Sequence, residues 1–157
     1  MQASSFDEAA FFRSLQRSGA RALLIGRRAL VVLGLPVLTA DYDFWIAPED
    51  IETFNAALVP FDLHPTCSVS EARRHGRYAL ENDERVDVLV ARTVIARTGE
   101  HVVFDEVWSR RRAVELSNGL AVHLPSLDDL ILTKRFALRP KDLEDIRLLE
   151  ILREEAP

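Results

Sequence analysis

Residues 84–91 alternate valine with other side chains, and this period of two predicts a β-strand. Val86, Val88 and Val90 share one face of that strand, whereas Asp87 lies on the other. An unpaired carboxylate in an apolar strand is costly unless a cation or hydrogen bonds compensate for its lost hydration. The chain therefore has to build a β-sheet and to provide Asp87 with a partner.

A second strand with acidic residues is predicted earlier in the chain, at residues 40–46. Its apolar side chains share one face: Tyr42, Phe44 and Ile46. Asp41 and Asp43 lie on the opposite face, about 7 Å apart at a rise of ~3.4 Å per residue. If this strand neighbours that of Asp87, three carboxylates converge, and each close pair repels by roughly 4 kcal/mol at ~4 Å and an effective dielectric constant near ~20.

Converging carboxylates predict a site for a divalent cation. Asp41, Asp43 and Asp87 are the candidate catalytic residues and the candidate metal ligands. Oxygen ligands favour Mg²⁺ or Mn²⁺ over zinc, and Mg²⁺ sites usually combine one or two carboxylates with water and substrate phosphates. The predicted chemistry is phosphoryl or nucleotidyl transfer. The structural alternative is that these acids cap turns or pair with arginines.

A glycine turn between a predicted strand at 21–25 and a predicted helix at 27–33 offers a complementary phosphate site. Exposed backbone N–H groups at the start of a helix attract phosphate. Arg27 and Arg28 add positive charge next to Gly26. These three residues are therefore candidate nucleotide-binding residues.

The remaining patterns predict further helices and strands. Predicted helices cover residues 5–18, 48–58, 126–138 and the stretch from Pro140 onward, with a helical turn at 70–75. Predicted strands cover residues 61–67 and 77–80, followed by a hairpin over 114–124 around Asn118-Gly119. Ser5 and Glu8 fit a capping box at the start of the first helix. The elements predict an α/β (α+β) fold, a small mixed β-sheet flanked by helices, with two C-terminal helices in a single domain over 1–157.

Composition narrows the class of protein. The net charge of −5, from 20 basic and 25 acidic residues, argues against a chain that coats nucleic acid through its overall charge. The single cysteine, Cys67, excludes an internal disulfide and a thiolate zinc cluster. The longest nearly apolar run, residues 29–38, is too short to span a membrane, and the acidic start of the chain is unlike a signal peptide. We expect a cytoplasmic protein with no membrane partner.

Four stretches carry a resemblance to a known family: residues 24–34, 38–46, 85–90 and 124–134, the last continuing into 139–146. They resemble the nucleotidyltransferase-fold superfamily, in particular its small bacterial branch that includes toxins of abortive-infection toxin–antitoxin pairs. The resemblance implies transfer of an NMP from an NTP to a hydroxyl of RNA, tRNA or protein, with two Mg²⁺ ions. It also implies an antitoxin protein as a partner.

The resemblance assigns roles to five residues. Gly26 would hold the triphosphate. Asp41, Asp43 and Asp87 would hold the metal ions. Lys134, on a later helix, would help to bind the nucleotide, although a lysine there can also simply cover surface with its stem.

Two features leave alternatives open. The family usually has glycine or serine after the turn glycine, whereas Arg27 follows Gly26 here, and its side chain either obstructs the phosphates or grips them. An obstructed site would make the protein a catalytically inactive nucleotidyltransferase-like binding or protein-interaction module. The arginine-rich runs at 73–77 and 110–112 either bind acceptor RNA or form solvated surface.

Overall fold

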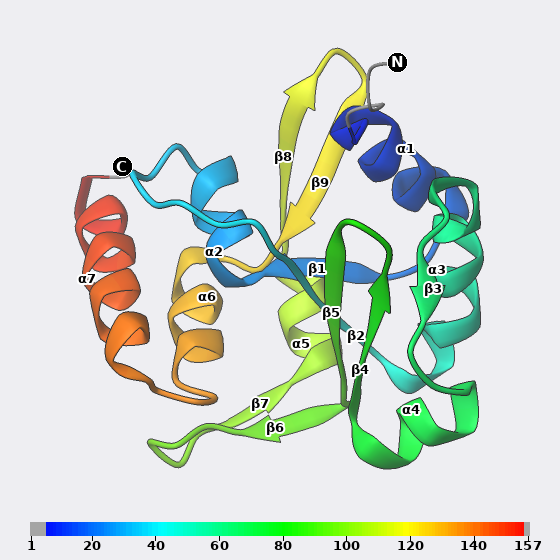
Figure 1. Ribbon diagram of the computed structural model, residues 1–157. Coiled ribbons are helices and arrows are strands. Elements are labelled where there is room, and N and C mark those ends of the chain that lie inside the picture. The colour runs from blue at the N-terminus through cyan, green and yellow to red at the C-terminus, as the bar shows by residue number, and fades with distance from the viewer. Residues whose placement is uncertain (1–5, 156–157) are drawn as a thin grey trace.

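The main β-sheet has the predicted mixed character. The protein is described by a computed structural model over residues 6–155, and within this range the sheet has five strands in the order β1-β2-β5-β4-β3 (Figure 1). Strands β2 and β5 run parallel, whereas the other neighbouring pairs run antiparallel. The strands are Ala22–Ile25 (β1), Tyr42–Ile46 (β2), His64–Pro65 (β3), Arg77–Glu81 (β4) and Arg85–Val90 (β5).

Seven α-helices are found in the described part of the chain, and the two predicted C-terminal helices lie side by side (Figure 1). The helices are Glu8–Ser18 (α1), Gly26–Val32 (α2), Ile51–Leu58 (α3), Val69–His75 (α4), Phe104–Ser109 (α5), Leu127–Lys134 (α6) and Pro140–Glu155 (α7). Over residues 6–155, none of them is both long and apolar enough to cross a membrane.

The larger hydrophobic core lies on the sheet face that carries Tyr42 and Phe44. Phe11 of α1 packs against the Tyr42 ring, with the ring centroids 5.2 Å apart. Phe54 of α3 packs edge-on against Phe44 at 5.3 Å. The alternation in β2 therefore directs its apolar face toward α1 and α3, and leaves Asp43 on the other face.

A smaller core on the opposite face is built around Trp45, which is fully buried. The rings of Phe104 and Phe136 lie edge-on to Trp45 at 5.3 and 5.5 Å, and the indole N–H donates to the carbonyl of Ala91 at 2.9 Å. Helix α5 and a hairpin flank this core; the hairpin strands are Thr93–Ile95 (β6) and His101–Val103 (β7). No element was predicted here, because strands of three residues are too short to show a period of two.

Helices α1 and α6 are shorter than predicted. Helix α1 begins at Glu8, later than the predicted residue 5, because Asp7 is its N-cap and accepts a hydrogen bond from the backbone N–H of Ala10 at 3.0 Å. The predicted capping residue Ser5 lies outside the described residues. Helix α6 ends at Lys134 and not at residue 138.

The stretch before β4 also contains less regular secondary structure than predicted. The predicted strand at 61–67 is reduced to the two residues of β3, because residues 59–61 form a 3-10 turn. The predicted helix at 48–58 is present, with a 3-10 first turn at Pro48–Asp50.

The hairpin predicted over residues 114–124 is confirmed as Arg112–Ser117 (β8) paired with Leu120–Leu124 (β9).

Candidate active site

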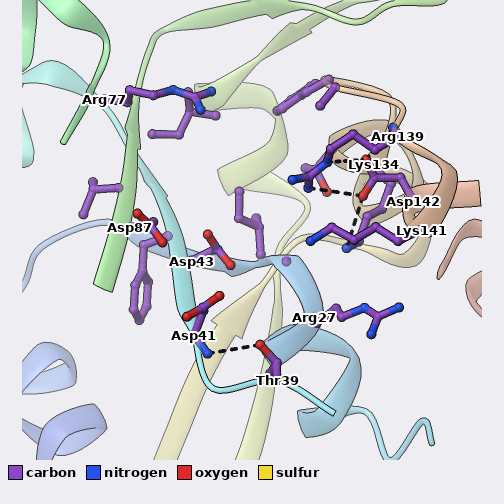
Figure 2. Close-up of a pocket in the computed structure, with 18 of the residues that line it drawn as sticks. Arg27, Thr39, Asp41, Asp43, Arg77, Asp87, Lys134, Arg139, Lys141 and Asp142 are labelled. Carbon is purple, nitrogen blue, oxygen red and sulfur yellow. Dashed lines mark hydrogen bonds and ion pairs between the residues drawn. The ribbon is translucent and has the colours of Figure 1, made fainter. Parts of the chain in front are cut away.

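Two of the three predicted acids are paired across neighbouring strands. Asp43 on β2 and Asp87 on β5 are register partners in the parallel pair, so both side chains project from the same face of the sheet. Asp41 lies just before β2, and its backbone N–H donates to the hydroxyl of Thr39 at 3.1 Å. Figure 2 shows the three carboxylates along one side of a cleft of about 380 Å³ that all of them line.

The glycine turn lies directly against Asp43. Ile25, the last residue of β1, is the register partner of Asp43, and Gly26 follows with a φ of 69°. A Cβ atom at Gly26 would lie 2.5 Å from Oδ2 of Asp43 and 2.9 Å from its Cβ. Only glycine satisfies both the backbone conformation and this close approach. The backbone of the turn is thereby held next to the acids.

The electrostatic environment of Asp43 favours a cation. Burial raises the pKa of its carboxyl from 3.8 to about 6, and the nearby charges of Asp87 and Asp41 act in the same direction. Lys134 and Arg139 lower it, but less strongly. At neutral pH the site therefore contains a partly buried carboxylate that is repelled by two others.

Asp87 has a partner of its own. Its two oxygens accept hydrogen bonds from Nε of Arg85 at 3.0 and 3.3 Å, and Arg85 also donates to Glu81 at 2.7 Å. These side chains are largely exposed to solvent, so the pairing is a weak one. Among residues 6–155, no group of three His, Cys, Asp or Glu side chains is arranged to hold a metal ion. The three acids line the cleft without forming such a group.

A positively charged wall faces the acids from α2, α6, α7 and the loop that joins α6 to α7. The cations that line this side of the cleft are Arg27, Lys134, Arg139 and Lys141. Lys134 is only 6% exposed, and its Nζ lies 2.7 Å from Oδ2 of Asp145. Figure 2 shows Arg27 directed away from Asp43. Its guanidinium lies 3.3 Å from Oδ1 of Asp145, so the space beside Gly26 stays open.

Arg28 is placed differently from the other candidate nucleotide-binding residues. Gly26, Arg27 and Lys134 line the cleft, but Arg28 does not. It donates to the carbonyls of Thr39 and Asp41 at 3.2 and 3.3 Å, and its guanidinium lies 4.1 Å from the centre of the Tyr42 ring. Arg28 therefore holds the backbone that leads into Asp41.

Several lining residues were not among the candidate site residues from the sequence: Thr39, Arg77, Arg139, Lys141 and Asp142. Arg77 belongs to the arginine-rich run at 73–77, but the run alone could not separate it from solvated neighbours. A clearer signal was available for Asp142 and Asp145. Two acids three positions apart fall on the buried side of the last helix, where charge is rare.

The described fold is similar to solved nucleotidyltransferase structures. A crystal structure of ANT(2'')-Ia in complex with adenylyl-2''-tobramycin matches with a TM-score of 0.61 and 16% identity, over 89% of this chain and 83% of that one. The lincosamide antibiotic adenylyltransferase LnuA, solved with lincomycin, matches with a TM-score of 0.60 and 15% identity, over 94% and 98%. TM1012 from Thermotoga maritima, a proposed nucleotidyltransferase, matches with a TM-score of 0.59 and 16% identity, over 92% and 89%.

These matches identify the fold. No protein-family model matches the sequence, and no curated protein is similar enough to count as a relative. The structural matches, in contrast, span nearly the whole of this chain and most of each neighbour. Their identities are low, so they are evidence for the fold alone, which in this chain is a mixed sheet flanked by helices with two more at the C-terminal end. The chain has the nucleotidyltransferase fold.

Proposed function

We propose that the protein is a metal-dependent nucleotidyltransferase that moves an NMP from an NTP to an acceptor hydroxyl. The observation that carries this proposal is the register pairing of Asp43 with Asp87, with the backbone of Gly26 packed against Asp43. In such a reaction the acceptor oxygen bonds to the α-phosphorus, the bond to pyrophosphate breaks, and the hydroxyl proton passes to water.

The residues present fit a hard divalent cation. Asp41, Asp43 and Asp87 offer only carboxylate oxygens, which suit Mg²⁺ or Mn²⁺, and their mutual repulsion favours a bound cation. An open set of ligands is also expected where water and substrate phosphates complete the coordination. When bound, the metal would lower the pKa of the attacking hydroxyl and neutralise charge on the phosphates.

The other residues of the cleft bind and orient the substrates in this proposal. The backbone of the Gly26 turn approaches the triphosphate, and Arg27 and Lys134 contact its oxygens from the side of α6 and α7. Arg27 grips the phosphates and does not obstruct them, since its guanidinium lies beside Asp145 and away from Asp43. The inactive binding module is therefore the less favoured alternative.

The acceptor side of the cleft is the side of β4. Figure 2 shows Arg77 there, beyond Asp87, and Arg73 and Arg74 are exposed on the adjoining helix α4. These cations support an anionic acceptor such as RNA, with a protein hydroxyl as the alternative. We extend the proposal to a cytoplasmic toxin that is neutralised by an antitoxin protein, on the basis of the sequence resemblance.

Label transfer tests the proposed function. The protein is incubated with Mg²⁺, each α-labelled NTP, and bulk tRNA or a protein extract. Labelled acceptor is expected with wild type and is expected to be lost with Asp43→Asn. Asp128→Asn, an exposed acid on α6 that does not line the cleft, is the matched control and should transfer label like wild type. Transfer that survives Asp43→Asn would overturn the proposal.

A further inference from the structure

Asp145 is a fully buried carboxylate next to the cleft. It lies on α7 with 0% of its surface exposed, and a charge is costly in such a place unless it is closely paired. Its two contacts are with cations that line the cleft, Lys134 and Arg27. The residue itself does not line the cleft, so it acts on the site through these two side chains.

The two contacts of Asp145 are unequal. Nζ of Lys134 donates to Oδ2 at 2.7 Å, which is a short, charge-assisted hydrogen bond. The guanidinium of Arg27 is held at longer range, with Nε 3.4 Å from Oδ2 and Nη2 3.3 Å from Oδ1. Oδ1 accepts no hydrogen bond of good geometry, although it is buried. Lys134 is therefore held tightly, whereas Arg27 is held loosely.

Asp142, one turn earlier on α7, supports the same wall. Its Oδ2 accepts from the backbone N–H of Arg139 at 2.8 Å and from Nε of Arg139 at 3.1 Å. Although burial opposes it, the hydrogen bonds and the charge of Arg139 hold the pKa of Asp142 below its usual value. Its Oδ1 lies 3.9 Å from Nζ of Lys134. Asp142 thus remains charged and adds to the pairing of Lys134.

The charges of this cluster do not cancel. Three cations, Arg27, Lys134 and Arg139, face the two carboxylates of Asp142 and Asp145. Lys141 adds a fourth cation to the same wall, so two positive charges are left over opposite the acids. A ligand with several negative charges, such as a triphosphate, would remove this imbalance.

We propose that Asp145 is the positioning residue of the triphosphate site. It fixes Lys134 in its working position and holds Arg27 beside the cleft until a triphosphate draws the guanidinium away. When Arg27 leaves, Asp145 stays paired through Lys134, so the movement leaves no buried charge unpaired. This inference rests on the proposed function, because it takes the ligand of the wall to be an NTP.

A purely structural role of Asp145 would change ligand binding in a different way. If Asp145 only neutralised a buried cation, its replacement would loosen the packing of α6 on α7 and weaken every ligand of the cleft alike. A positioning role concerns the β- and γ-phosphates, which a nucleoside monophosphate lacks. The ratio of NTP affinity to NMP affinity therefore separates the two roles.

Calorimetric titration in the presence of Mg²⁺ measures the ratio of NTP affinity to NMP affinity. The four common NTPs are titrated into wild type, and the one that binds most tightly is compared with its monophosphate. Asp145→Asn is expected to weaken NTP binding by about tenfold or more, the loss of a charge-assisted contact, and NMP binding by less than about threefold. Asp128→Asn is the matched control, because Asp128 also joins α6 to α7, through an exposed 2.7 Å ion pair with Arg153.

A second variant covers the case in which Asp145→Asn fails to fold. Arg27→Gln changes a partly exposed side chain and should likewise weaken the NTP selectively. Equal weakening of NTP and NMP, or no weakening in either variant, would overturn the positioning role while leaving the proposed function intact. A wild-type protein that binds no NTP would overturn both.

Discussion

Asp43 and Asp87 face each other as register partners on the parallel strands β2 and β5, and the charge of Asp87 helps to raise the pKa of Asp43 to about 6. The protein thus keeps two like charges close together beside a cleft. Such an arrangement destabilises the folded state unless a cation is bound. The repulsion between the two carboxylates therefore has a measurable cost in stability, as is typical of functional sites.

The first prediction concerns this cost and its dependence on pH. The pKa of Asp43 in the folded, metal-free protein, about 6, lies above its usual 3.8, so the folded state binds the proton more tightly than the unfolded state. The contribution of Asp43 to stability is therefore lost as the pH rises from 4 to 6. Asp43→Asn, which cannot ionise, should become more stable than wild type over this range, by about 3 kcal/mol at neutral pH.

The measurement is chemical denaturation in the presence of EDTA, with wild type and Asp43→Asn compared at each pH. Taking the difference between the two proteins removes the contributions of all other titrating groups. A difference that stays constant from pH 4 to pH 7, or a variant that becomes less stable than wild type as the pH rises, would show that the charges of the acids do not destabilise the fold.

The second prediction concerns the glycine turn. Gly26→Ala should abolish nucleotide binding and destabilise the fold by more than about 2 kcal/mol, because a Cβ atom would collide with Asp43 in addition to disfavouring the positive φ. Gly34→Ala, just beyond the other end of α2, is the matched control, since Gly34 has a φ of 84° but a Cβ atom there would meet no atom within 4 Å. Thermal unfolding and NTP titration measure both effects. Equal losses in the two variants would refute the close approach.

The third prediction concerns the acceptor. Arg77→Ala should raise the KM for the acceptor several-fold and leave the KM for the NTP unchanged, because Arg77 lines the cleft on the side of β4 and away from Lys134. The effect should shrink at high salt, as expected for contact with an anionic group. Arg147→Ala, an exposed change on α7, is the control. A change in the KM for the NTP alone would show that Arg77 contacts the NTP and not the acceptor.

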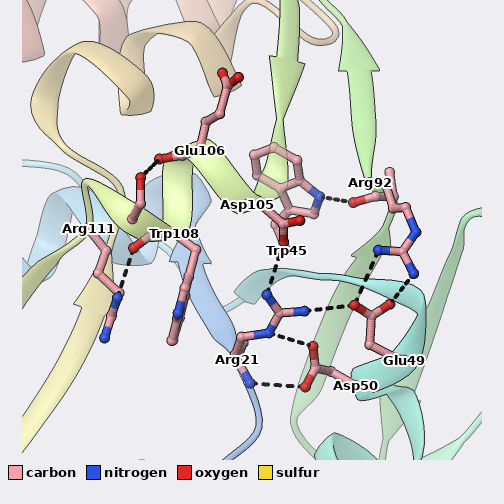
Figure 3. A network of polar contacts seen from close by, with 11 residues as sticks. Arg21, Trp45, Glu49, Asp50, Arg92, Asp105, Glu106, Trp108 and Arg111 are labelled. Atoms are coloured by element: carbon pink, nitrogen blue, oxygen red, sulfur yellow. Dashed lines mark hydrogen bonds and ion pairs between the residues drawn. The ribbon is translucent and has the colours of Figure 1, made fainter.

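The fourth prediction concerns a charged cluster remote from the cleft. Figure 3 shows Arg21 joined to Glu49, Asp50 and Asp105, at 2.8, 3.3 and 3.0 Å, which connects β1 to the start of α3 and to α5. Arg21→Ala should lower the free energy of unfolding by about 1–2 kcal/mol, since several contacts of a partly buried cation are lost together. Nucleotide binding should be unaffected.

Denaturation by urea measures this loss. Arg153→Ala is the comparison, because Arg153 makes a single exposed ion pair with Asp128, and pairs of that kind contribute less than about 1 kcal/mol. If both variants lose the same stability, Arg21 does not connect the three elements in the way its contacts indicate.

The sequence predicted those features that depend on a local pattern of residues. The alternation in residues 40–46 and 84–91 was sufficient to place Asp43 and Asp87 on strands, with Asp41 just before one, and the glycine between a predicted strand and a predicted helix singled out Gly26. What it could not provide was the pairing of β2 with β5, because register between strands that are some forty residues apart depends on the whole sheet.

The positively charged wall shows most clearly what the sequence could not predict. Lys134 was a candidate from the sequence, but its link to Asp145 joins two helices across a turn, and no local pattern encodes such a contact. The hairpin β6-β7 was missed for another reason, because its strands are too short to show a period. In both cases the information lies in tertiary packing.

The most direct test of the central claim is to locate the metal. Crystals grown with Mn²⁺ and a non-hydrolysable NTP would be measured at a wavelength where manganese scatters anomalously. We expect anomalous peaks within coordination distance of Asp43 and Asp87, with the triphosphate between the Gly26 turn and Lys134. Manganese bound away from these aspartates, or a triphosphate held elsewhere on the protein, would contradict the account.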